Sequence, residues 1–556
     1  MLRSTLALAL LASAVPASAQ EAPQTAAPAA EAAPAYPDLP LEQAAMRAHV
    51  MFLADDTMQG REAGTEEYDI AANYVAARFY ANGLRPAGDN GGFLQRVPLM
   101  NYKPAEHGSF VFTRRGAEPV TLSFGEDFVP AGDPTSETTT VDAPLVFVGW
   151  GIHAPSEGRD DYRGVDVRGK IVVFLNGVPE ELHSEIRASL GSANAKADMA
   201  GRLGAVGAIA INNPGPRSLP FAAQAANWQR SRTTWVNPDG SGHVDTPQTP
   251  VLGTLSREGA AKLFQGARMP WEQVQAAAAD SNARLRAMNL PGRLAVTLKT
   301  ERELFESANV AGLLPGSDPA VADEVVVLTA HLDHVGVGRP VEGDSIYNGA
   351  MDNAVGIASL IEEASRFQKS GERPRRSILF LAVTAEEKGL VGADYFAENP
   401  SLPGKTLVAN VNLDMPILTY RFEDVIAFGA DRSTLGPIVR RAAQNIGVGF
   451  SPDPMPEQSL FVRSDHYRFV QQGIPSVFLW PGHAGPGAEG TNHFFQHHYH
   501  RPSDQLDQAP VIDWEAGVRF IEVNYQIARE IADADARPVW NAGDFFGTLY
   551  EGPMAR

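Results

Sequence analysis

The second half of the chain alternates apolar, β-branched runs with amphipathic stretches. After Ser307, apolar runs cover residues 325–330 and 377–384, and between them apolar residues recur at helical spacing from about 354 to 367. Strands that alternate with helices are typical of a sheet that helices cover on both faces. This pattern predicts an α/β fold with a mixed, mostly parallel sheet.

The length of the chain predicts more than one folded part, because single cores stop growing at roughly 250–300 residues. The chain has 556 residues, and between 138 and 295 its texture changes to short β-branched runs separated by Gly and Pro turns. Such a texture indicates a separate β-rich insert. The expected divisions are an α/β domain in two parts at 39–137 and 296–540, the insert at 138–295, and a C-terminal tail at 541–556.

The first 19 residues have the pattern of an export signal. Arg3 precedes an apolar stretch at 6–15, and Ala17-Ser18-Ala19 is the small-x-small pattern of a signal peptidase site. We expect cleavage near Ala19 and a periplasmic or secreted protein. The alternative, a membrane anchor, needs a longer apolar run of about 20 residues, so no stable membrane insertion is expected. Residues 20–38, rich in Ala, Pro and Glu, indicate a flexible linker.

The charge and the absence of cysteine exclude several classes of partner and ligand. Asp and Glu number 66 against 46 Lys and Arg, which gives a formal net charge of −20. Nucleic-acid-binding surfaces need clustered cations, so no nucleic-acid partner is expected. Without cysteine, neither disulfides nor thiolate metal ligands are available. The oligomeric state is left open by the sequence.

Acidic residues and histidines follow directly after three of the apolar runs. In open α/β sheets ligands bind beyond the carboxyl ends of the strands, so these side chains are expected to converge on one crevice. Several carboxylates gathered there indicate a bound cation, because burial resists their ionisation. Imidazole and carboxylate without thiolate favour zinc, although manganese or cobalt accept similar ligands. The side chains are those of His331, Asp333, His334, Glu386, Glu387 and Asp414.

The spacing within these segments suggests different roles for the individual side chains. Asp333 lies two residues after His331, so in an extended segment its carboxylate would hold the free ring nitrogen of the histidine. Glu386 and Glu387 would point to opposite sides of an extended chain. One could then bind metal while the other moves a proton, which favours a catalytic site over a purely structural one.

Two further segments are candidates for the same cluster. Asp352 directly precedes the amphipathic stretch at 354–367, where it would either bind metal or cap a helix. The presence of the other segments favours metal. The histidine-rich stretch from His493 to Asp504 adds several imidazoles, and spacing alone does not choose among them.

In this order, the segments resemble the co-catalytic zinc aminopeptidase family, which includes leucyl-type aminopeptidases and relatives of glutamate carboxypeptidase. The resemblance runs from about 40 to 530. The insert resembles the protease-associated domain that many members carry, through residues 146–151, 160–162 and 169–173. The segments that carry the main resemblance are Gly60-Arg61-x-x-Gly64-Thr65, 309–316, His331-x-Asp333-His334, Asp352-Asn353, Glu386-Glu387-x-Gly389, Asn412-x-Asp414, Ser464-Asp465-His466 and Tyr499-His500-x-Pro502-x-Asp504.

The resemblance implies two zinc ions and a ligand set for each. It places His331 and Asp414 on one ion and Glu387 and His500 on the other. Asp352 would bridge the two ions. The His-x-Pro-x-Asp pattern of the family is what selects His500 from the histidine-rich stretch.

The resemblance also implies roles for residues that do not bind metal. Asp333 would orient its neighbouring histidine ligand, and Glu386 would be the general base and later the acid. His498 is kept as an alternative metal ligand in the histidine-rich stretch. His334 and His466 are expected to be supporting or core histidines.

As a whole, the resemblance implies an exported, metal-dependent exopeptidase that hydrolyses peptides. An aminopeptidase is expected ahead of a carboxypeptidase. The alternatives from other classes are a single-zinc glutaminyl cyclase and a non-catalytic, receptor-like binding module. The side-chain preference of the substrate is not predicted.

Overall fold

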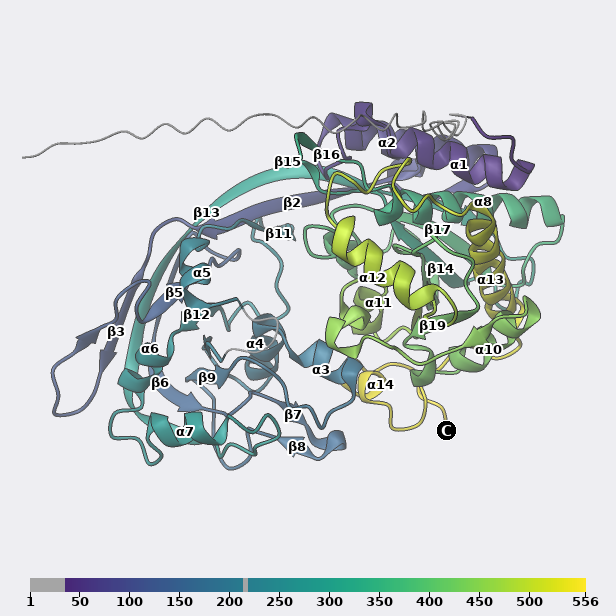
Figure 1. Ribbon diagram of the computed structural model, residues 1–556. Coiled ribbons are helices and arrows are strands. Elements are labelled where there is room, and N and C mark those ends of the chain that lie inside the picture. The colour runs from purple at the N-terminus through teal and green to yellow at the C-terminus, as the bar shows by residue number, and fades with distance from the viewer. Residues whose placement is uncertain (1–35, 214–218) are drawn as a thin grey trace, which may run out of the picture. The chain divides into compact units, whose positions relative to one another are not determined.

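A computed structural model describes residues 36–213 and 219–556 (Figure 1). The predicted signal peptide and most of the predicted linker, up to residue 35, lie outside the described residues. Within the described ranges, no helix combines the length and the apolar character needed to cross a membrane.

The first sheet is made of strands from both parts of the predicted α/β domain. These strands are β1 (Arg85–Pro86), β2 (Leu94–Pro104), β11 (Arg232–Trp235), β13 (Met288–Leu314), β14 (Glu324–His331), β17 (Ser377–Val383), β18 (Thr406–Asn412), β19 (Asp424–Phe428), β20 (Gly449–Phe450) and β21 (Ser476–Pro481). Parallel strands β17, β14, β18 and β21 lie side by side at its centre. Antiparallel β13 pairs with β17, and antiparallel β19 pairs with β21. The mixed, mostly parallel sheet that the sequence predicts is therefore confirmed.

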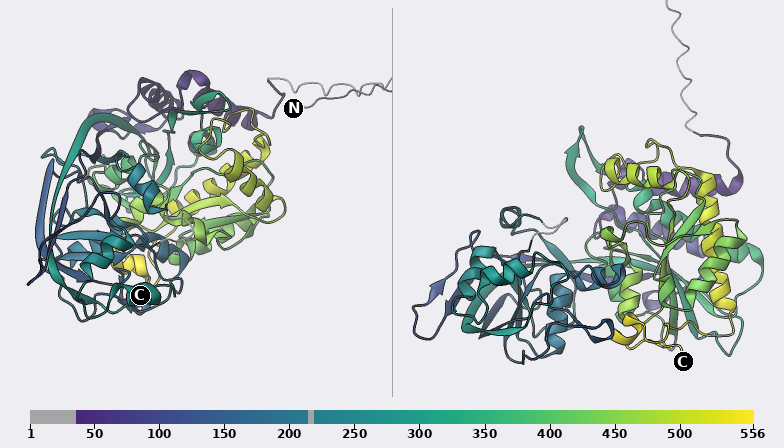
Figure 2. Two further views of the ribbon diagram at one scale, coloured as in Figure 1. Left: turned by 60° about the vertical axis from the view of Figure 1, so that its left-hand side comes forward. Right: turned by 60° about the horizontal axis from the view of Figure 1, so that its bottom comes forward.

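Helices cover both faces of this sheet (Figures 1 and 2). The helices of the α/β part are α1 (Leu41–Leu53), α2 (Glu66–Ala81), α8 (Val355–Ser370), α9 (Val391–Glu398), α10 (Leu435–Asn445), α11 (His466–Gln471), α12 (Gly487–His497), α13 (Trp514–Asp533) and α14 (Phe545–Leu549). Helices α8 and α13 pack on one face, whereas α9 and α11 pack on the other. The amphipathic stretch predicted at 354–367 corresponds to α8.

The central strands are buried on both faces, which explains why they are apolar throughout. Val326 and Leu328 of β14 pack into the core beneath α8 and α13. Their neighbours Val325 and Val327 pack into the core on the opposite face, together with Phe396 of α9. Successive side chains of a strand point to opposite faces, so a strand covered on both sides needs apolar residues at every position.

A second sheet contains most of the predicted insert. Its strands are β3 (Ser109–Thr113), β4 (Val120–Thr121), β5 (Phe128–Pro130), β6 (Thr138–Phe147), β9 (Ile171–Leu175), β10 (Gly207–Ile211), β12 (Val251–Leu255) and the first half of β13. Helices α3 (Ser184–Leu190), α4 (Ala193–Arg202), α5 (Phe221–Ala226), α6 (Arg257–Leu263) and α7 (Trp271–Ala277) belong to the same stretch. Two short hairpins, β7 (His153–Ala154) with β8 (Arg159–Asp160) and β15 (Gly336–Val341) with β16 (Asp344–Tyr347), stand outside both sheets.

The long strand β13 belongs to both sheets. Residues 288–299 pair with β3 and β6, and residues 300–314 pair with β2 and β17. Strand pairing also crosses the predicted boundary at residue 138, because β3 and β5 precede it and still join the second sheet. In turn, β11 lies within the predicted insert and pairs with β2 of the first sheet. The domain boundaries themselves remain a prediction.

Replacing Leu379 with Ala should lower the free energy of unfolding by roughly 2–5 kcal/mol, because it leaves a cavity in the core. Leu379 lies in β17 and is fully buried. The matched control is Leu304→Ala, at a position that is 65% exposed, where a change within about 0.5 kcal/mol is expected. Urea unfolding followed by tryptophan fluorescence measures both. Equal losses in the two variants would contradict the described packing.

Candidate metal centre

Three neighbouring parallel strands end at one edge of the first sheet. In the pairing of β14 with its two neighbours, His331 lies opposite Val383, and Thr329 lies opposite Asn412. The residues that follow these strand ends therefore emerge close together, as the sequence predicts for the carboxyl edge of a parallel sheet. The predicted cluster begins here.

Asp352 lies between two histidines from distant parts of the chain. Its Oδ1 is 3.2 Å from Nε2 of His331, and its Oδ2 is 3.3 Å from Nε2 of His500. Each histidine also contacts a second carboxylate: His331 Nε2 is 3.0 Å from Asp414 Oδ1, and His500 Nε2 is 3.2 Å from Glu387 Oε2. The five predicted ligand side chains thus form two groups that share one carboxylate.

The donor atoms of these groups fit metal ions. Zinc binds histidine nitrogen and carboxylate oxygen at about 2.0–2.2 Å, which sets neighbouring ligand atoms about 3.3–3.5 Å apart in a tetrahedral site. The two contacts of Asp352, at 3.2 and 3.3 Å, lie close to this spacing. Glu387 Oε1 is buried and lies 2.7 Å from His334 Nδ1, outside the geometry of a regular hydrogen bond. Three carboxylates brought this close repel one another unless a cation offsets their charge.

The position of Asp352 is set by hydrogen bonds to its own backbone. The N-cap position of α8 is occupied by Ala354, which makes no side-chain hydrogen bond. Asp352 therefore does not cap this helix. Instead, the carboxylate of Asp504 accepts hydrogen bonds from the amide of Met351 at 2.8 Å and from the amide of Asp352 at 3.0 Å. Asp504 belongs to the His-x-Pro-x-Asp segment, and no pattern in the sequence indicates this contact.

Asn353 joins the Asp352 segment to the Asp414 segment. Its side-chain amide donates to the carbonyl of Leu413 at 2.9 Å, and its Oδ1 accepts from the amide of Met415 at 3.0 Å. These two residues flank Asp414 on either side. An asparagine can donate and accept at the same time, which explains why an amide rather than a second carboxylate follows Asp352.

Asp414 is held by a chain of polar side chains that lie in the core. Ser464 Oγ donates to Asp414 Oδ2, and Asn412 Nδ2 donates to Ser464 Oγ at 2.5 Å. Thr329 Oγ1 in turn donates to Asn412 Oδ1 at 2.6 Å. The indole of Trp480 donates to the carbonyl of Asp414 at 2.8 Å. The free oxygen of this carboxylate is thereby aimed at His331.

Asp333 acts on a different partner from the one that the sequence predicts. Its backbone carbonyl, rather than its carboxylate, lies 3.0 Å from His331 Nδ1. The carboxylate instead accepts hydrogen bonds from the amides of Glu386 at 3.0 Å and Glu387 at 3.3 Å. The prediction assumed an extended segment, whereas β14 ends at His331 and the chain turns there.

Glu386 and Glu387 lie in a turn after β17 and face different neighbours. Burial raises the pKa of the Glu386 carboxyl well above its ordinary value; His331 opposes this rise, and the negative charge of Asp414 adds to it. Glu387 contacts His500 instead. The turn starts at Ala385, whose φ of 54° takes the chain out of the extended conformation. Adjacent glutamates therefore serve the two sides of the cluster.

The remaining histidines differ in how close they come to the cluster. His334 is buried, and its Nδ1 lies 2.7 Å from Glu387 Oε1 but 3.9 Å from Asp352 Oδ2. His498 is turned away, because its ring nitrogens contact the backbone carbonyls of Ser503 and Ala509. His466 is fully buried between aromatic rings, and burial lowers its pKa to about 3. Of these three, only His334 comes near the ligands.

His500 is oriented by its neighbour in the sequence. Its ring stacks on Tyr499 with the ring centroids 3.9 Å apart, and Arg463 donates to the Tyr499 hydroxyl at 2.9 Å. The side chain of His500 is 39% exposed, in contrast to that of His331 at 1%. The second group of ligands is thus the one that is open to solvent.

Arg61 fastens the loops that carry the cluster. It is fully buried and donates to the carbonyls of Leu332 at 3.0 Å, Asn348 at 2.6 Å and Gly349 at 3.1 Å, and also to that of Leu53. Leu332 precedes Asp333, and Asn348 and Gly349 precede Asp352. The Gly60-Arg61 motif was recognised in the sequence without a role, because its partners are backbone atoms.

Residues 309–528 match the model of Peptidase family M28. The matched residues contain all five predicted ligands together with Glu386. They leave out nearly all of the second sheet.

Two curated relatives cover much of the chain. The aminopeptidase NAALADL1 of Rattus norvegicus is 25% identical over 406 residues, which is 64% of this chain and 48% of the relative. The probable glutamate carboxypeptidase VP8 of Zea mays is 25% identical over 469 residues, or 79% of this chain and 58% of the relative. The chain thus spans about half the length of these relatives.

Among solved structures, an aminopeptidase from Aneurinibacillus sp. strain AM-1 is 20% identical, with a TM-score of 0.45. The match covers 89% of this chain and 95% of that one. BSAP, a zinc aminopeptidase from Bacillus subtilis, is 18% identical with a TM-score of 0.42, over 91% and 98% of the two chains.

Replacing Arg61 with Lys should weaken zinc binding by roughly 10–100-fold, as is typical when a group that orients metal ligands is lost. A lysine keeps the charge but cannot donate to all four carbonyls. Zinc affinity is measured by competition with a chelating dye. The control is Arg78→Lys, an exposed position on α2, which should bind zinc as the unaltered protein does. An unchanged affinity in Arg61→Lys would contradict its role.

Proposed function

We propose that this protein is an exported, zinc-dependent exopeptidase that hydrolyses peptide bonds, and specifically an aminopeptidase. The observation that carries the proposal is the position of Asp352, whose two oxygens lie 3.2 Å from His331 and 3.3 Å from His500. A carboxylate shared in this way suits a pair of neighbouring metal ions. Export rests on the pattern of the first 19 residues.

In the proposed site, each half of the cluster supplies one imidazole and one carboxylate of its own. His331 and Asp414 would hold one zinc ion, Glu387 and His500 would hold the other, and Asp352 would serve both. Zinc bound there would lower the pKa of a water molecule and polarise the scissile carbonyl. His334 is the alternative to His500, since it also contacts Glu387.

Glu386 is the proposed general base, because it lies beside the ligands without being one of them. Its carboxylate would remove a proton from water while the water oxygen bonds to the carbonyl carbon. The carbon–nitrogen bond then breaks, and the Glu386 carboxyl passes the same proton to the departing amine. Asp333 fixes the amide of Glu386 at 3.0 Å, which positions the base.

The names of the curated relatives favour an aminopeptidase ahead of a carboxypeptidase. The rat relative named an aminopeptidase agrees with this choice. The maize relative named a probable glutamate carboxypeptidase makes the carboxypeptidase the second candidate.

The second sheet is proposed to act as a protease-associated domain that limits the size of the substrate. A cavity of about 940 Å³ is lined by Glu387 and Gly389 of the α/β part and also by Arg232 and His243 of the insert. A peptide bound at the cluster would therefore extend along residues from both parts. This arrangement favours short substrates or free chain ends.

Replacing Glu386 with Gln should lower kcat by roughly 10²–10⁴-fold while the zinc content stays unchanged, because the amide cannot accept a proton. Hydrolysis of a leucine anilide and metal analysis by mass spectrometry give the two measurements. Glu342→Gln, at an exposed turn, serves as the control and should keep full activity. A near-native rate in Glu386→Gln would show that another group is the base.

Removal of metal with a chelator should abolish activity, and added zinc should restore it. The restored enzyme should hydrolyse aminoacyl anilides and reject the same compounds after N-acetylation, since an aminopeptidase requires a free α-amino group. Cleavage of N-blocked peptides from the carboxyl end would identify a carboxypeptidase. Formation of pyroglutamate from N-terminal Gln would identify a cyclase, and a metal-free, inactive protein would indicate a binding module.

A further inference from the structure

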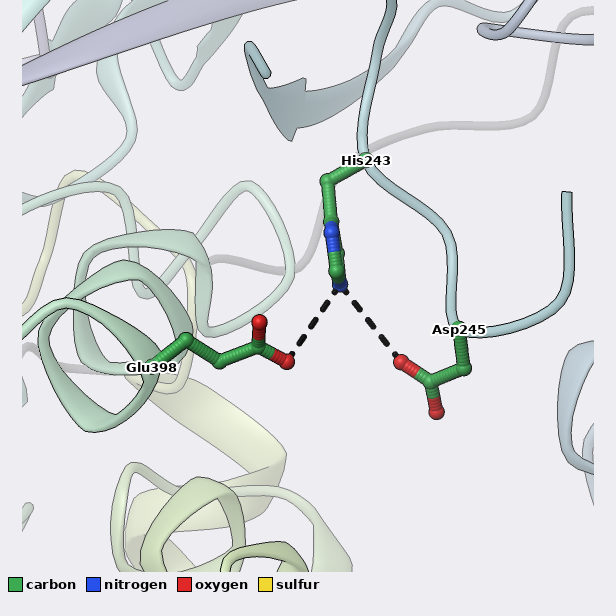
Figure 3. A group of neighbouring side chains, drawn as sticks. All are labelled: His243, Asp245 and Glu398. Atoms are coloured by element: carbon green, nitrogen blue, oxygen red, sulfur yellow. Dashed lines mark ion pairs between the residues drawn. The ribbon is translucent and has the colours of Figure 1, made fainter. Parts of the chain in front are cut away.

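A second group of metal-binding side chains lies away from the cluster around Asp352. It consists of His243 and Asp245, from the loop between β11 and β12, and Glu398, the last residue of α9 (Figure 3). The three side chains come from both parts of the chain and point toward one another. The proposed mechanism uses none of them.

The distances within this group match a shared metal ion better than a hydrogen bond. His243 Nε2 lies 3.5 Å from Asp245 Oδ1 and 3.5 Å from Glu398 Oε1 (Figure 3). Ordinary N–H···O bonds are about 2.9–3.0 Å long. Ligand atoms around a tetrahedral zinc ion are about 3.3–3.5 Å apart. The nitrogen is itself buried and has no partner in hydrogen-bond geometry among the described residues.

The imidazole of His243 is held in place by contacts within the protein, without a metal ion. Its ring stacks on the indole of Trp235, with centroids 3.9 Å apart and an angle of 12° between the planes. The indole is fixed in turn, because its Nε1 donates to Asp394 Oδ2 at 2.9 Å. The amide of His243 also donates to the Trp235 carbonyl at 2.8 Å. An ordered ring loses little entropy when it binds an ion.

The charges around the group favour a cation. The carboxylates of Asp245 and Glu398 both lie beside His243 Nε2. Arg468 lies 3.4 Å from the neighbouring Asp394 rather than within the group. Two carboxylates beside one imidazole nitrogen form a negatively charged donor set that suits a divalent cation.

We propose that His243, Asp245 and Glu398 bind a divalent metal ion of the zinc type, distinct from the ions at Asp352. Imidazole nitrogen with carboxylate oxygen suits zinc rather than calcium, which prefers oxygen ligands alone. Asp245 and Glu398 are 35% and 30% exposed, so water can complete the coordination. The ion would thus have three protein ligands, and water molecules would fill its remaining coordination positions.

The location gives this ion a mechanical role. Glu398 closes α9, the helix that follows the Glu386-Glu387 turn, and His243 belongs to the predicted insert. An ion bound to both would fasten the insert loop to that helix beside the cavity that reaches Glu387. The ion would therefore fix one wall of the space in which a peptide is proposed to lie.

The test counts zinc in the full-length protein. The protein is stripped with a chelator, reloaded with zinc, dialysed and analysed by mass spectrometry. His243→Gln and Glu398→Gln should each hold one zinc ion fewer per chain than the unaltered protein. The matched control is His153→Gln, because His153 lies 3.0 Å from a single carboxylate, that of Asp160, in the same insert. The control should lose no zinc.

The result is a difference between variants, so it does not depend on how many ions the Asp352 cluster holds. Circular dichroism identifies the variants that fold, and Asp245→Asn replaces either of the first two if one does not. A loss of one ion in the folded variants, with none in the control, supports the site. An equal zinc content in all of them overturns it and leaves His243 as a protonated ion-pair partner of the two carboxylates.

Discussion

The α/β part of this protein is organised around one carboxylate that two imidazoles share. Asp352 can lie between His331 and His500 only if three chain segments meet within a few ångströms. The parallel alignment of β17, β14 and β18 supplies the first condition, because it brings their ends to one edge. A bound cation would offset the repulsion that such a gathering of acids causes.

Most of the supporting contacts go to backbone atoms rather than to the ligands themselves. Arg61 donates to the carbonyls of Leu332 and Gly349, which precede Asp333 and Asp352, and Asp504 accepts from the amide of Asp352. Asn353 donates to the carbonyl of Leu413 and accepts from the amide of Met415, the two residues that flank Asp414. The predicted ligands thereby keep the lone pairs that a metal ion would need, and neighbouring residues position the loops. Because the supporting hydrogen bonds go to the backbone, the loops are held rigidly while the side-chain donor atoms stay available to a metal ion.

The sequence predicted the parts of the structure that depend on local patterns. Apolar runs predicted the central strands, and the polar residues at their ends predicted which side chains would meet. It was less informative where the chain leaves regular structure: Asp333 was expected to face His331, but the chain turns after β14 and its carboxylate serves Glu386 instead. The proximity of His334 to Glu387 and the contacts of Arg61 were also unpredictable, since they depend on tertiary packing rather than on spacing.

The shared strand β13 has a consequence for the order in which the chain can fold. Strand β2 is made early, yet its most extensive partner is the second half of β13, which is synthesised only after the whole second sheet. Until then one edge of β2 is unpaired and open to wrong associations. Pairing over so long a separation in sequence is slow. This part of the first sheet is therefore complete only when residues 300–310 have reached β2.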